Sequence, residues 1–119
     1  MEVFVIPLKL PSCNEYINAC RVNRYAGAKM KAETEEAISW FLKNPHTINA
    51  PVTIAFEWEE PNRKRDIDGI AFGKKFILDA LVKKGILPND SQKWVRGFTD
   101  TFTVGKTHKV KITIREIQQ

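Results

Sequence analysis

The sequence has little cysteine and no long apolar run. Its 119 residues include two cysteines, Cys13 and Cys20, which do not form a Cys-x-x-Cys pair. A disulfide scaffold or a zinc ribbon is therefore not indicated. No apolar stretch approaches the roughly 20 residues of a membrane span, and the N-terminus lacks the basic start and small-residue cleavage site of a signal peptide. We expect a cytoplasmic protein with reduced thiols and no membrane partner.

Acidic residues are also in deficit, with 14 Asp and Glu against 19 Lys and Arg, which gives a net charge of +5. The balance allows an anionic partner without identifying one. Much of the basic charge falls in two groups, Arg63–Lys64–Arg65 and then Lys74, Lys75, Lys83 and Lys84. A charge run is commonly just a solvated surface. Basic residues directly beside aspartates, however, are typical of a site for phosphate and metal.

Hydrophobic periodicity predicts one domain, residues 1–119, of the α+β class with a mixed sheet. Val52, Ile54, Phe56 and Trp58 alternate with polar residues, as in a half-buried strand. The other predicted strands are 1–10, 94–104 and 109–116, with helices at 29–43 and 69–84, a loop at 11–25 and a turn at 87–91. The order is β-α-β-α-β-β, and Gly105 would join the last two strands as a hairpin.

Asp66 and Asp68 form an Asp-x-Asp motif after the second predicted strand. If Asp66 ends that strand, both carboxylates point to the same side. Two close carboxylates need a shared proton, a basic partner or a divalent cation. Mg²⁺ fits best, because it prefers carboxylate oxygens together with waters and substrate phosphates. The motif alone is weak, since such pairs recur freely in surface loops.

The predicted helix at 69–84 is apolar almost all round, so its narrow polar stripe needs a reason. At about 100° per residue, Asp68, Lys75 and Asp79 fall within roughly 40° of one another. Lys74 lies about 100° away. Lys75 would lean toward Asp68, and an ion pair between Lys75 and Asp79 is a simpler role that could coexist with catalysis.

Several motifs in combination resemble the RusA family of Holliday-junction resolvases. They are NRKRDID (62–68), KKFILDAL (74–81), KKGILPND (83–90) and the N-terminal LPSCNEY (10–16). The likeness covers most of the chain and is weakest over 21–49. Gly69 stands where the family commonly has Asn, and the lysine lies further from the Asp-x-Asp than in the shorter form of the family. Lys74 and Lys75 are therefore both candidates, and the helical phase favours Lys75.

The resemblance implies a homodimer with a mixed α/β fold that cuts four-way DNA junctions with Mg²⁺, for which Mn²⁺ could substitute. It implies that Asp66, Asp68 and Asp90 form the metal site and that Lys75 is the essential lysine. The DNA backbone would be held by the basic residues Arg63, Lys64, Arg65, Lys83 and Lys84. Two other readings stay open: a non-catalytic basic DNA-binding module, and a metal nuclease for flap or single-stranded DNA.

Overall fold

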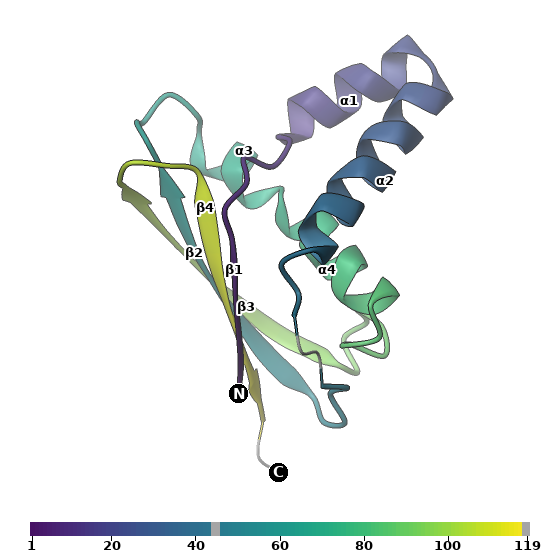
Figure 1. Cartoon of the computed structure of the whole chain (residues 1–119), viewed down its shortest axis with the longest axis vertical. Coiled ribbons are helices and arrows are strands. Elements are labelled where there is room, and N and C mark those ends of the chain that lie inside the picture. Colours follow the sequence, from purple (N-terminus) through teal and green to yellow (C-terminus); the bar gives the residue numbers. More distant parts are fainter. Residues whose placement is uncertain (44–45, 118–119) are drawn as a thin grey trace.

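A computed structural model describes residues 1–43 and 46–117 of the chain. Four strands and four helical segments follow one another along a single α+β domain (Figure 1). They are β1 (Glu2–Ile6), α1 (Cys13–Val22), α2 (Arg24–Ser39), β2 (Val52–Glu60), α3 (Ile67–Ala71), α4 (Lys74–Lys83), β3 (Val95–Val104) and β4 (Lys109–Glu116).

The four strands form one mixed sheet in the order β1-β4-β2-β3. β4 pairs antiparallel with β1 and with β2, whereas β2 and β3 are parallel. The predicted mixed sheet is confirmed, but the predicted hairpin is wrong because β2 lies between β3 and β4. Gly105 instead crosses over the end of β2, where an added Cβ would lie 2.3 Å from Cδ of Glu59.

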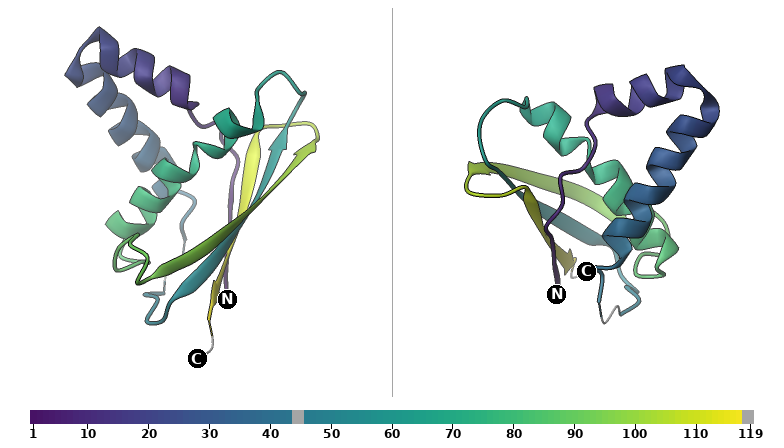
Figure 2. Two further views of the ribbon diagram at one scale, coloured as in Figure 1. Left: turned by 180° about the vertical axis from the view of Figure 1, so that it is seen from behind. Right: turned by 45° about the horizontal axis from the view of Figure 1, so that its top comes forward.

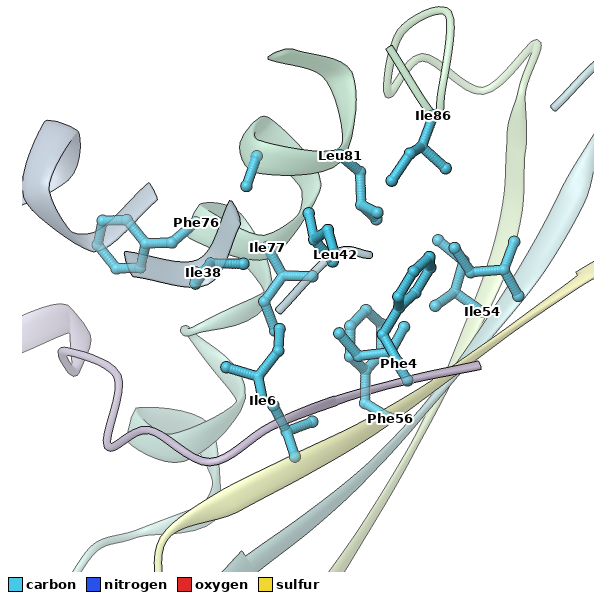
Figure 3. Packing of buried hydrophobic residues seen from close by; sticks show 14 of the residues in the cluster. Phe4, Ile6, Ile38, Leu42, Ile54, Phe56, Phe76, Ile77, Leu81 and Ile86 are labelled. Carbon is cyan, nitrogen blue, oxygen red and sulfur yellow. The ribbon is translucent and has the colours of Figure 1, made fainter. Parts of the chain in front are cut away.

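The helices cover one face of the sheet and leave the other uncovered (Figure 2). Alternate side chains of β2, namely Ile54, Phe56 and Trp58, point into the core, as the sequence pattern predicts. Ile77 and Leu81 of α4 lie on the helix side of this cluster, whereas Phe76 lies to one side near Ile38 (Figure 3). β2 and β3 are parallel, so the connection between them crosses over the sheet as a helical segment. That crossover, α3 and α4, lies on the covered face.

The segment predicted as a loop over 11–25 is instead largely helix α1. Ser12 accepts a hydrogen bond from the Glu15 backbone at 3.2 Å, and the Glu15 side chain accepts one from Ser12 N at 3.2 Å. This capping box was readable as Ser-x-x-Glu, but the polar composition of the segment favoured a loop. α1 and α2 form a tight hairpin, since Cys20 packs so closely on Gly27 that an added Cβ would lie 2.4 Å from its Sγ.

The single helix predicted over 69–84 is divided into α3 and α4. Phe72 and Gly73 remain right-handed, but the turn tightens, with hydrogen bonds from Gly73 N to Ile70 O and from Lys75 N to Phe72 O. Gly73 permits this bend against the core, because an added Cβ would lie 2.9 Å from Leu10 Cδ1. The predicted stop at Gly85 is confirmed by its φ of 80°.

Two further predictions concern thiols and membranes. Cys13 and Cys20 are both free, as expected. Among the residues that the structure describes, no helix combines the length and the apolar character needed to cross a bilayer.

Candidate functional site

Asp66 and Asp68 lie at the start of α3, beyond the end of β2. The expectation that Asp66 ends the strand is wrong, because β2 stops at Glu60 and a turn intervenes. Asp66 occupies the N-cap position without making a side-chain cap hydrogen bond, and Asp68 Oδ1 accepts one from Gly69 N at 2.9 Å. Both side chains are exposed, and neither forms an ion pair with any residue in the described ranges.

Asp66 and Asp68 line two neighbouring cavities. The larger, of about 780 Å³, lies between the 62–70 segment and the end of β3. The smaller, of about 290 Å³, lies between the same acids and the start of α1, where Ser12 and Asn14 contribute to its wall. Asp66 and Asp68 line both, and so does Arg65. The two acids thus lie where two cavities adjoin.

Arg65 is held by the fold rather than presented to a ligand as a free cation. Its Nη1 lies 3.3 Å from Glu60 Oε1, and its Nη2 donates to the Leu10 carbonyl at 2.9 Å. Glu60 is buried and also contacts His108, whose Nδ1 lies 2.9 Å from Oε2. This network fixes the segment that leads to Asp66. Sequence reasoning missed Glu60, although Glu60 continues the even-numbered buried positions of β2 and could have been suspected on that ground.

The other predicted phosphate ligands are distributed unevenly. Arg63 and Lys64 are exposed beside Asp66 and form no ion pair with any described residue. Lys83 and Lys84 lie at the opposite end of α4, which is about 15 Å long. Lys83 is already paired with Glu35, at 2.5 Å from its Oε1. The structure therefore places the first basic group beside the acids and places Lys83 and Lys84 away from them.

Lys74 and Lys75 have different surroundings. The Lys74 amine lies 2.5 Å from Asp100 Oδ2 on β3 and 5.1 Å from the centre of the Phe98 ring. Asp100 also accepts a hydrogen bond from Trp58 Nε1 at 2.8 Å. Lys75 is exposed in the first turn of α4. The sequence predicts that Lys74 points away from Asp68 and Asp79, but it gives no indication that Lys74 pairs with Asp100.

Asp79 pairs with Lys31 of α2 at 3.1 Å, so the expected ion pair with Lys75 is absent from the described residues. Lys31 also lies 2.5 Å from Oε2 of Glu35, which is 3% exposed. Burial would raise the pKa of the Glu35 carboxyl, but the hydrogen bonds and charges of Lys31 and Lys83 outweigh it and hold the pKa below its ordinary value. The cluster Lys31, Glu35, Asp79 and Lys83 joins α2 to α4.

Asp90 lies away from the other two acids. In the parallel pairing of β2 with β3, Val52 is opposite Val95 and Glu60 is opposite Val104. Asp90 precedes Val95 and Asp66 follows Glu60, so the nine-residue strand β2, roughly 26 Å long, separates the two regions. Within 1–43 and 46–117, no three His, Cys, Asp or Glu side chains are grouped so that they could hold a metal ion.

Comparison with known proteins adds no relative. No protein-family model matches the sequence, and no curated protein matches it significantly. Function therefore has to be inferred from the side chains and from their geometry.

Proposed function

We propose that the chain is a Mg²⁺-dependent endonuclease that cuts phosphodiester bonds in branched DNA and resolves four-way junctions by paired nicks as a homodimer. The observation that carries the proposal is the pair Asp66 and Asp68. Both are exposed at two cavities and form no ion pair within 1–43 and 46–117, although Arg63, Lys64 and Arg65 precede them directly. Two acids that join elements of the fold, Glu35 and Asp100, are by contrast paired with lysines.

The donor chemistry of this pair fits Mg²⁺, which is commonly bound by one or two carboxylates together with waters and substrate phosphates. A bound Mg²⁺ or Mn²⁺ supplies a water of lowered pKa and neutralises charge on the phosphate. Asp66 and Asp68 would hold and orient the cation. Arg63 and Lys64 attract the DNA backbone through sequence-independent contacts that weaken with salt. Arg65, fixed by Glu60 and Leu10, holds the aspartates in place.

Lys75 would act on the phosphate rather than on the fold. It lies in the first turn of α4, two residues beyond the bend at Gly73, and its side chain is exposed. An ammonium group beside a phosphate stabilises the charge that builds up on the phosphate oxygens during cleavage. Lys74 does not serve in this way, because Asp100 and the Phe98 ring hold its amine.

Asp90 takes part in the proposed site only through a second copy of the chain, because β2 separates it from Asp66 and Asp68. In a twofold dimer, Asp90 of the partner subunit can meet the Asp-x-Asp pair. Mixing an Asp68→Asn protein with an Asp90→Asn protein tests this arrangement. Mixed dimers would then contain one intact site and nick junctions, whereas dimers with sites confined to one chain would stay inactive.

The test of the proposed function compares labelled four-way junction, flap and duplex DNA, with Mg²⁺ and with a chelator. We expect paired nicks in the junction that require the cation. Asp68→Asn should stop cutting while junction binding remains, and Asp79→Asn is the matched control because it removes the same charge from a structural ion pair. Binding without cutting under any cation would identify a DNA-binding module instead. Cutting confined to flaps would identify the other nuclease class.

A further inference from the structure

The larger cavity beside Asp66 and Asp68 has more apolar wall than a phosphate site needs. Its volume of about 780 Å³ is within the range of small-molecule sites, roughly 300–1,000 Å³. Ile67, Ile70 and Val104 line it together with the ring of Phe102. Ile67 is 60% exposed and Val104 is 50% exposed, so both present apolar surface to the solvent at this cavity. A ligand with flat apolar faces would cover that surface.

Hydrogen-bond donors lie on the polar side of the same cavity. Asn62 Oδ1 accepts a hydrogen bond from Lys64 N at 3.0 Å. This contact assigns the oxygen and leaves the amide NH₂ to donate elsewhere. Arg65 also lines the cavity, but Glu60 and Leu10 hold its Nη atoms and its Nε is buried. The free N–H groups at this cavity are therefore those of the Asn62 amide, whose residue lines it as well. Such donors match a ligand whose edge carries acceptor atoms.

We propose that this cavity receives one unstacked nucleobase of the DNA strand, from a nucleotide next to the phosphate that is cut. The inference rests on the proposed function, because it places the scissile phosphate at Asp66 and Asp68, which line the same cavity. Phe102 and Ile67 contact the faces of the base, and the amide donors of Asn62 bind acceptors on its edge. A base must leave the stack to enter, which costs least where pairing is already interrupted, as at a branch point.

This cavity would make the enzyme selective in two respects. Branched DNA is preferred over duplex, because its bases are easier to unstack. Cut sites are preferred where the adjacent base carries acceptors that two N–H groups can reach, such as O6 and N7 of guanine. Phe102 and Asn62 are therefore specificity-determining residues, whereas Arg65 fixes the segment that they border through its ion pair with Glu60.

The experiment uses a four-way junction whose cut position has been mapped. The nucleotide on each side of that position is replaced in turn by an abasic residue or by the fluorescent base 2-aminopurine. We expect the abasic change on one side to slow cutting about tenfold, the scale of one base–aromatic contact. In Asp68→Asn protein, which we expect to bind without cutting, 2-aminopurine at that position should change its fluorescence on binding.

Phe102→Leu and Phe98→Leu form a matched pair of variants. Both rings lie on β3 and face the helices, but only Phe102 lines the cavity. Phe102→Leu should abolish the fluorescence change and the penalty for an abasic site, whereas Phe98→Leu should preserve both. Normal cutting of abasic junctions on both sides, with no fluorescence response, would overturn the base pocket and leave the nuclease standing. A response that depends on Phe102 in a protein that never cuts would support the pocket and reject the nuclease.

Discussion

Acidic side chains occur in two different surroundings in this protein. Between α2 and α4, Glu35 is buried at 3% exposure and lies against two lysines, Lys31 and Lys83. At the start of α3, Asp66 and Asp68 are exposed and make no ion pair with any residue of the described chain, although basic residues adjoin them in sequence. Lysines neutralise Glu35 within the fold, whereas Asp66 and Asp68 are two residues apart with no such partner, so they are the better candidates for binding an external cation. The comparison distinguishes an acid that stabilises the fold from the acids that we propose bind the metal ion.

The largest expected effect comes from the open acids. Asp68→Asn keeps the size of the side chain and removes its charge, so cutting should fall by about a hundredfold or more, because even outer partners of metal ligands matter by 10–100-fold. The free energy of unfolding should change by less than about 0.5 kcal/mol, since the side chain is exposed. The cutting rate is measured at saturating Mg²⁺, and the free energy of unfolding is measured by urea denaturation. A variant that cuts at the normal rate would show that Asp68 holds no cation.

Two neighbouring lysines show the same contrast between a side chain paired within the fold, Lys74, and an exposed one, Lys75. Lys75→Ala should lower the cutting rate by about a hundredfold with little loss of junction affinity, because its amine stabilises charge formed during the reaction. Lys74→Ala should instead destabilise the fold by about 1–2 kcal/mol, because Asp100 loses a half-buried charged partner. Single-turnover kinetics on saturated DNA separates the two. If Lys74→Ala alone stopped cutting without loss of stability, the catalytic lysine would be the one that contacts Asp100.

Glu35→Gln is the structural counterpart of Asp68→Asn. It should lower the free energy of unfolding by about 1–2 kcal/mol, since two lysines lose a charged acceptor. The cutting rate per folded molecule should stay normal. Because the pKa of Glu35 is lowered in the folded state, the stability that it contributes is present above the ordinary pKa of glutamate and is lost as pH falls through the lowered value. Urea midpoints measured from pH 7 down to pH 3 should therefore converge for the variant and the parent protein.

The smallest effect concerns the basic run before the acids. Replacing Arg63 and Lys64 together by Ala should flatten the salt dependence of junction binding by up to about two units of slope, because each cation releases about one counterion. Arg65→Ala should change stability more than slope, since Glu60 and Leu10 hold its guanidinium. Binding titrations over a range of salt concentrations measure both. An unchanged slope in the double variant would place the DNA elsewhere on the surface.

Local patterns in the sequence predict much of this fold. The alternation in β2 and β4 places Phe56 and Ile112 in the core, as predicted, because the two faces of a strand differ in burial. Gly85 ends α4 where the pattern predicts, since its φ is positive. The missed helix α1 also carried a local signal, the capping box of Ser12 and Glu15. Its polar surface hid that signal, because no residue of α1 is buried.

Some features of the candidate site can likewise be predicted from the sequence, whereas others depend on tertiary contacts. Asp66 and Asp68 are two residues apart with basic residues directly before them, so the sequence alone marks them as a candidate cation-binding pair. The distance to Asp90, the pairing of Lys74 with Asp100 and the fixing of Arg65 by Glu60 depend on which strands lie side by side. Those contacts join residues 5 to 55 positions apart, and most of them form only when β2 and β3 pair in parallel with α3 and α4 folded over them. Short-range periodicity carries no information about that pairing, so only the tertiary structure decided which acids stay open.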